Sequence, residues 1–145
     1  MFILSIWLCP VKPRSWHYTK KFNIFGAPIT ARKIMDKVQP NDLIIFHLLR
    51  KKSGIVDVGK VVSHVYLDHT DIWGRNKWPL RIKIDLVPNL QRKKDNLIPL
   101  STLFVISSKN ITIEPFLKGI VLAQVSKGQY QNLKRTFQKF SQKVI

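Results

Sequence analysis

Aromatic and basic side chains alternate in two stretches of the sequence, and this combination suits the binding of a flat, anionic molecule. The aromatic members are Trp16, His17, Tyr18 and Phe25 in the first stretch, and Trp73 and Trp78 in the second. The basic residues between and beside them are Lys12, Arg14, Lys20, Lys21, Arg75, Lys77 and Arg81. A ring can stack on a nucleobase while neighbouring cations hold the phosphates. The two stretches therefore predict a base-binding site, with these basic residues as candidate phosphate ligands.

The second stretch, WGRNKW at residues 73–78, is the more specific signal. Its two tryptophans flank a Gly-Arg-Asn-Lys turn that is too polar to bury both rings together. We expect at least one ring to be exposed or to line a pocket, and both to be removable without unfolding the protein. A structural role remains the alternative for any single tryptophan. Trp7, which lies between Ile6 and Leu8, is expected in the core or in the wall of a barrel.

Catalytic and metal-binding patterns find little support in the sequence. Asp68 and Asp71 are candidates for paired-carboxylate catalysis, but nothing in their shared loop predicts that they converge. The spacing of His64, Asp68 and His69 matches no standard zinc or iron site. The single cysteine, Cys9, has no evident base and is expected to be a small strand residue. We therefore predict a protein that is not an enzyme and that uses no metal or cofactor.

The charge balance indicates an anionic partner. The 145 residues include 25 Lys and Arg against 8 Asp and Glu, which gives a formal net charge of +17. Nucleic acid is the commonest partner of so basic a domain, whereas a membrane surface would require a basic amphipathic helix with a large apolar face. The apolar content of 45% excludes a disordered basic tail. The length favours one domain, over residues 1–145.

The N-terminus and the cysteine content predict a cytoplasmic protein. The apolar run at residues 1–8 is short, lacks preceding basic residues and is soon followed by Pro10. Neither a signal peptide nor a membrane span is therefore expected. A single cysteine permits no internal disulfide, which is typical of a reducing compartment.

The elements that must position these residues follow from the hydrophobic pattern. Strands are predicted over residues 2–9, 43–49, 57–67 and 80–87, and helices over 28–37 and 127–142. Residues 11–28 are expected to form a loop with one helical turn after Ser15, followed by the start of the first helix. Residues 98–106 fit either a helix or a strand. Strands first, with helices inserted and at the end, predict one α+β domain built on a small mixed β-barrel.

In sequence order these motifs resemble the EVE domain, a relative of the YTH domain within the PUA-like superfamily. The resemblance spans nearly the whole chain. IWLCPVKPRSW resembles the opening strand and loop of the family, and NIFGAP resembles its aromatic-glycine turn. QPNDLIIFHLL and GIVDVGKVV resemble the two strands that follow, and FLKGIVLAQVSKGQYQNLKRTF resembles the closing segment and last helix. DIWGRNKWPLRIKIDLV is similar to the W-x-x-D-K-W-x-G-x-F-x-V-x-W pattern of YTH domains.

The resemblance implies a PUA-like fold with a concave aromatic pocket that accepts a modified or unstacked base. Carried over to this sequence, the wall of the pocket would be Phe25, Trp73 and Trp78, with Trp16 beside them. Gly26 would give the backbone access to the edge of the base. Phe25 stands where the family usually has tryptophan.

Two interpretations of function remain open from the sequence. The leading one is a nucleic-acid-binding domain, with RNA favoured over DNA, whose basic surface holds the phosphates while the pocket receives the base. The alternative is a ribosome-associated protein that clamps RNA with its basic surface and has a vestigial pocket, which the spread of lysines along the chain favours. Ribosomal RNA and transfer RNA are the candidate RNAs, and DNA remains a candidate ligand. A hydrolase of the related PUA-like type is a further alternative.

Overall fold

The computed structural model describes residues 5–49, 54–74, 78–86 and 121–128, together with Gln131 and Arg135. Its strands are β1 (Ile6–Val11), β2 (Ile24–Ala27), β3 (Leu43–Leu48), β4 (Gly54–Val61), β5 (Tyr66–Leu67), β6 (Leu80–Leu86) and β7 (Ala123–Val125). Its helical elements are α1 (Pro13–Phe22), the 3-10 helix η1 (Ile29–Ala31) and α2 (Arg32–Met35). Within these residues, no helix is long and apolar enough to cross a bilayer.

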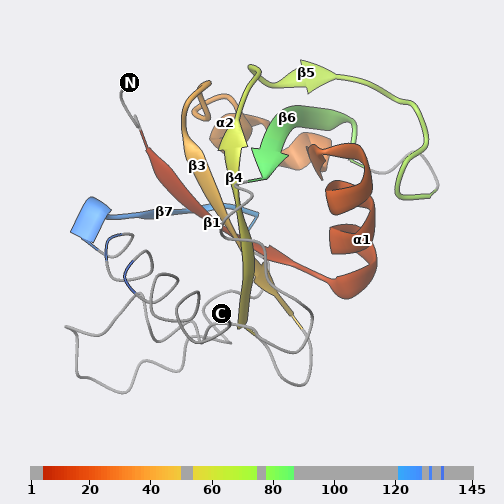
Figure 1. Cartoon of the computed structure of the whole chain (residues 1–145). Helices are drawn as coiled ribbons and strands as arrows, with labels where there is room; N and C mark the ends of the chain where they lie inside the picture. Colours follow the sequence, from red (N-terminus) through yellow and green to blue (C-terminus); the bar gives the residue numbers. More distant parts are fainter. Residues whose placement is uncertain are drawn as a thin grey trace.

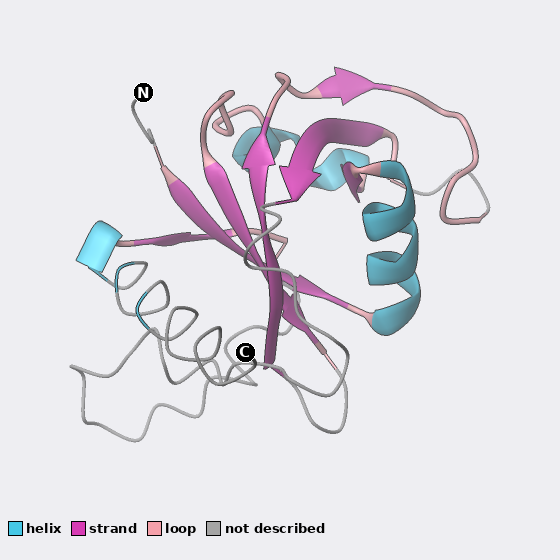
Figure 2. Ribbon diagram, in the orientation of Figure 1, coloured by secondary structure: helices cyan, strands magenta, loops and turns pink. Residues whose placement is uncertain are grey.

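The strands form one mixed sheet that curls into a half-barrel (Figures 1 and 2). Their order is β2-β6-β4-β3-β1-β7, and β5 pairs with β6 beside this path. The β1–β3 pair is parallel, and the other pairs are antiparallel. The predicted α+β fold with a small mixed barrel is therefore confirmed in the form of a curled half-barrel.

The core follows the apolar runs of the sequence. All six residues of β3 are buried, as expected for a central strand covered on both faces. In β6, the alternating residues Leu80, Ile82 and Ile84 are buried and Lys83 is exposed, as the pattern predicts. Trp7 is 4% exposed, which confirms its expected place in the core.

Helix α1 is the main difference from the predicted elements, because a loop with a single helical turn was expected there. Pro13 begins the helix, a position where the missing N–H of proline has no intrahelical partner to lose. Trp16 and Thr19 are the buried residues of α1, and Trp16 lies 5.0 Å from Phe46 of β3 between ring centroids. Asn23 ends the helix in the left-handed conformation, at φ 55°. Packing of these few side chains on the sheet outweighs the irregular local composition.

Other element boundaries shift, and part of the chain lies outside the described residues. The predicted strand at 57–67 begins earlier and divides into β4 and β5, while the helix at 28–37 is replaced by η1 and α2. In the predicted C-terminal helix, Lys127, Gly128, Gln131 and Arg135 are helical. The rest of that helix and the segment 98–106 lie outside the described residues.

A buried carboxylate joins the start of the sheet to the turn before β3. Asp42 is fully buried, and its two oxygens accept hydrogen bonds from three N–H groups. The donors are the backbone amides of Ser5 and Gln39, each at 2.9 Å, and the indole Nε1 of Trp7 at 3.0 Å. Because each donor would otherwise be left without a partner in the protein interior, Asp42 holds β1, its tryptophan and the turn in one arrangement.

Replacing Asp42 tests this arrangement. We expect Asp42→Ala to lower the free energy of unfolding by about 3 kcal/mol or more, because three donors lose their acceptor. Urea denaturation measures this change. Asp36→Ala is the matched control, because Asp36 is exposed and its contact is a 3.4 Å ion pair with Arg32 one helical turn away. Such a pair is worth about 0.5 kcal/mol at most, so equal effects of the two substitutions would contradict the proposed role of Asp42.

Candidate functional site

The site is built on the face of β2, β6 and β5 that points away from the core. Gly26 of β2 pairs with Arg81 of β6, which pairs in turn with Tyr66 of β5. Paired residues in antiparallel strands share a face, and the next pair, Phe25 and Ile82, is buried in the core. Gly26, Arg81 and Tyr66 therefore form a row across three strands on the opposite face.

Trp73 packs directly on this row, at the position where the row has no side chain. A Cβ atom on Gly26 would lie 2.5 Å from Cη2 and 2.7 Å from Cζ3 of Trp73, which is closer than the two can approach. Trp73 is 6% exposed as a result. Glycine is thus required at position 26 because the indole ring contacts the backbone there.

Arg81 holds the loop that carries Trp73 and Trp78. Its side chain is fully buried, and the guanidinium carbon lies 5.1 Å from the centroid of the Trp73 ring. Nη1 lies 3.3 Å from the Asp68 carboxylate, Nη2 donates to the Thr70 carbonyl, and Nε donates to the Trp78 carbonyl at 3.3 Å. One buried cation therefore contacts the loop at four points, at both of its ends and in its middle.

The partner of this cation is kept ionised. Hydrogen bonds from Thr70 to Asp68, including one from the backbone amide at 2.8 Å, hold the pKa of Asp68 below its ordinary value of 3.8. The positive charge of Arg81 lowers this pKa further. Burial, together with the negative charge of Asp68, raises the pKa of Tyr66. At neutral pH an ionised Asp68 therefore lies against Arg81 of the row, and Tyr66 is neutral.

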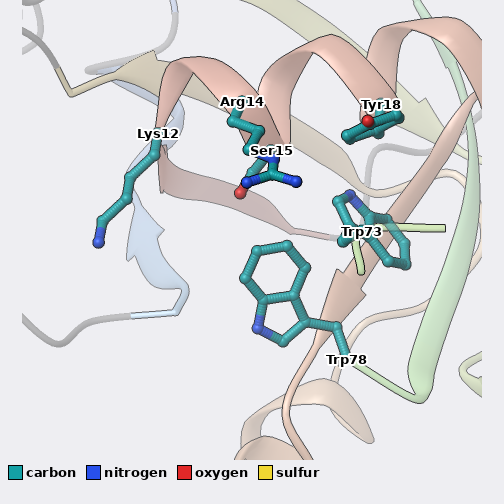
Figure 3. Close-up of a pocket in the computed structure, with 6 residues that line it drawn as sticks. All are labelled: Lys12, Arg14, Ser15, Tyr18, Trp73 and Trp78. Atoms are coloured by element: carbon teal, nitrogen blue, oxygen red, sulfur yellow. The ribbon is translucent and has the colours of Figure 1, made fainter. Parts of the chain in front are cut away.

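A pocket of about 200 Å³ lies between this loop and the first turns of α1 (Figure 3). Its lining residues are Lys12, Arg14, Ser15, Tyr18, Trp73 and Trp78. The centroids of the two indole rings are 5.4 Å apart, and the ring planes lie at 66° to each other. The rings therefore form two walls that meet at a corner. Figure 3 shows the side chains of α1 facing these walls, with Tyr18 above Trp73 and Arg14 and Ser15 across from Trp78. The arrangement offers flat apolar surfaces with cations beside them.

The backbone of Trp78 is held in an unfavourable conformation. Its φ angle is 61°, in the left-handed region that bulky side chains rarely adopt. Pro79 follows it and further restricts the residue that precedes it. Such strain costs about 1–3 kcal/mol and is concentrated at functional sites. Here the hydrogen bond from Arg81 and the contact with Trp73 keep the indole at the pocket.

The structure brings some of the predicted pocket residues together and places others elsewhere. Trp73 and Trp78 line the pocket as expected. Phe25 and Trp16 do not line it, because both are buried in the core. There the centroids of their rings lie 6.3 Å and 5.0 Å, respectively, from that of Phe46. Gly26 supports Trp73 instead of facing an open base site.

The predicted phosphate ligands are also divided. Lys12 and Arg14 are exposed at the pocket, while Lys20 and Lys21 are exposed near the end of α1 and do not line it. The prediction for Arg81 is wrong. Its guanidinium is buried against Trp73 and paired with Asp68, so it does not face solvent as a phosphate ligand would. Arg75 and Lys77 lie outside the described residues.

Two lining residues, Ser15 and Tyr18, are missed by the sequence interpretation as members of the pocket. Residues three or four positions apart share one face of a helix, so Arg14, Ser15 and Tyr18 come together once α1 is recognised. Expecting a loop there hid this spacing. The burial of Trp73 also changes the expectation for its removal, because loss of a buried indole costs about 3–5 kcal/mol.

Cys9 is not part of this site. It is 1% exposed, and burial raises the pKa of its thiol. The thiol therefore stays protonated and packs as a small strand residue, in agreement with its expected role.

The structure is a curled mixed sheet with an aromatic pocket beside one helix, and the sequence places it in a known domain family. The EVE domain model matches residues 5–104, and the chain belongs to the EVE domain family. The resemblance to the EVE domain is thereby confirmed, and the PUA-like fold that it implies is the fold of the solved structures described next.

Known proteins with the same fold differ widely in sequence. UPF0310 protein PH1033 of Pyrococcus horikoshii is 24% identical over 94 residues, covering 56% of this chain and 65% of that protein. The chain therefore matches less than two thirds of this relative. Human THYN1, solved in complex with DNA containing 5-methylcytosine, is 15% identical with a TM-score of 0.62, covering 92% of this chain and 97% of that structure. The Mmi1 YTH domain, solved in complex with RNA, is 14% identical with a TM-score of 0.66, covering 97% and 82%.

Substitution at Gly26 tests how the pocket is supported. We expect Gly26→Ala to displace the Trp73 ring, because the added methyl group overlaps it, and to lower the free energy of unfolding by about 1–3 kcal/mol. Thermal unfolding and tryptophan fluorescence measure both effects. Gly128→Ala is the control, because the nearest atom to an added Cβ there is 3.9 Å away. A Gly26→Ala protein with unchanged stability and fluorescence would contradict the close contact.

Proposed function

We propose that this protein binds nucleic acid and receives one modified or unstacked base in the pocket between α1 and the Trp73–Trp78 loop. The observation that carries the proposal is the corner formed by the two indole rings, 5.4 Å apart, with Lys12 and Arg14 beside it. Stacking of a base on an aromatic ring is worth about 1–3 kcal/mol. The two walls accept the face and the edge of a planar ring.

The size of the pocket supports a small ligand group. A volume of about 200 Å³ is below the roughly 300–1,000 Å³ of pockets for drug-sized molecules. A single base and a small substituent suit this space, while the rest of the strand stays outside. There the phosphates would meet the exposed Lys12, just before α1, and Arg14, Lys20 and Lys21 of α1.

Single-stranded RNA is the ligand we favour over duplex DNA. Loops and ends of RNA already present unstacked bases, whereas a duplex must flip a base out at a cost of a few kcal/mol. Two structures of the same fold support nucleic acid as the ligand class: human THYN1 was solved with DNA containing 5-methylcytosine, and the Mmi1 YTH domain with RNA.

Removing Trp78 tests the pocket directly. Glycine tolerates the positive φ of this position, so Trp78→Gly removes the ring and relieves the strain together. We expect it to weaken binding of a short single-stranded RNA by about 5- to 150-fold, the equivalent of about 1–3 kcal/mol. The Gly variant should also be about 1 kcal/mol more stable than Trp78→Ala. Fluorescence anisotropy and urea denaturation measure the two quantities.

An exposed aromatic residue outside the pocket provides the control. Phe22 lies at the end of α1, is 46% exposed and does not line the pocket, so Phe22→Ala should leave binding within about twofold of wild type. If Trp78→Gly binds RNA as tightly as Phe22→Ala does, the pocket is not the binding site. Binding by the basic surface alone, as in an RNA clamp, would then be the better account.

The basic surface predicts a strong dependence of affinity on salt. Each phosphate that a cation neutralises releases counterions, so about five such contacts give a slope of log K against log salt near −3.5 for single strands. The net charge of +17 and the exposed cations of α1 motivate this value. A titration series from low to moderate salt measures the slope, and an affinity that barely changes would contradict a role for the charge.

A further inference from the structure

The charges around the pocket are of one sign. Of the six residues that line it, Lys12 and Arg14 are basic and none is acidic. The charged side chains that line the pocket are therefore both positive.

The acidic residues nearest in the chain to the two indoles already have partners. Asp68 is paired with the buried Arg81, and Asp71 accepts a hydrogen bond from the Gly74 amide at 2.7 Å. Neither of them lines the pocket. Within the described part of the chain, the site thus lacks the carboxylate that would balance a cationic ligand.

The aromatic walls alone would favour a cation. Electron-rich ring faces attract ammonium and other positive groups, and aromatic cages commonly bind methylated cations in this way. In this protein the Trp73 ring already has a cationic partner, because the Arg81 guanidinium carbon lies 5.1 Å from the centroid of the ring. A second cation in the pocket would lie near Arg14 and Lys12, which have no acidic counterpart among the lining residues.

We infer that the pocket selects bases by charge: it accepts a neutral modified base and rejects a base that carries a positive charge. This inference rests on the proposed function and specifies its ligand class. The methyl group of an accepted base lies on a carbon atom or on an exocyclic nitrogen, positions that leave the ring neutral. Methylation on a ring nitrogen that creates a cation places that charge beside Arg14 and Lys12.

Isomeric bases separate charge from size. N6-methyladenine is neutral and N1-methyladenine is cationic at neutral pH, while 5-methylcytosine and 3-methylcytosine form a second such pair. Each base is placed at one position of the same short single-stranded RNA, and binding is measured by anisotropy at low salt, where charge effects are least screened. We expect the neutral isomer of each pair to bind at least tenfold more tightly.

Two variants identify the source of the selection. Arg14→Gln removes a cation from the pocket and should narrow the affinity gap between the neutral and the cationic isomers. Lys33→Gln removes the same charge from an exposed position on α2 that does not line the pocket, and should leave the gap unchanged. Both variants lower the net charge equally, so a difference between them reports the local field.

The outcomes distinguish this inference from the proposed function. Equal or tighter binding of the cationic isomers, with affinity still lost in Trp78→Gly, would overturn charge selection and leave the base pocket in place. A gap that closes as much in Lys33→Gln as in Arg14→Gln would also overturn it, because total charge would then be the cause. Binding of every RNA that is independent of Trp78 would overturn both proposals.

Discussion

The geometry of the candidate pocket depends on one buried arginine. Arg81 lies on a strand of the sheet, yet its guanidinium contacts the loop at Asp68, Thr70, Trp73 and Trp78. A buried cation is costly unless it is paired and hydrogen-bonded, and these contacts supply the pairing. The same contacts hold these four residues of the loop in place on the sheet. Both indole walls of the pocket are therefore positioned by contacts with the same buried side chain.

As a result, the two tryptophans of the loop have different roles. Trp73 is buried between Gly26 and Arg81, so it serves mainly to seat the loop. Trp78 is only partly buried and has a strained backbone, which the hydrogen bond from Arg81 and the contact with Trp73 support. A rigid wall beside a strained, accessible ring is suited to stacking, because the ring is ordered before the ligand arrives. Stability and binding should accordingly separate at Trp78 and coincide at Trp73.

The sequence predicts the fold better than the site. Apolar runs and alternation locate β3 and β6, and ordered motifs identify the family, because these signals depend on burial along the chain. The pocket depends on contacts between segments that are distant in sequence. The alternation of apolar and polar residues along β6 predicts that Arg81 faces solvent. In the structure the loop that contains Trp73 covers it, so Arg81 is buried. Phe25 and Tyr18 illustrate the same limit: an aromatic residue looks alike in a sequence whether it faces the core or a pocket.

The measurement that tests the central claim most directly is a crystal structure of the protein with a short single-stranded RNA carrying one neutral methylated base. The account predicts that this base lies against Trp73 and Trp78 in the pocket beside α1, with adjacent phosphates within hydrogen-bonding distance of Arg14 or Lys12. The Arg81 contacts with the loop should be unchanged from the free protein. RNA bound on another face, with no base between α1 and the Trp73–Trp78 loop, would contradict the account.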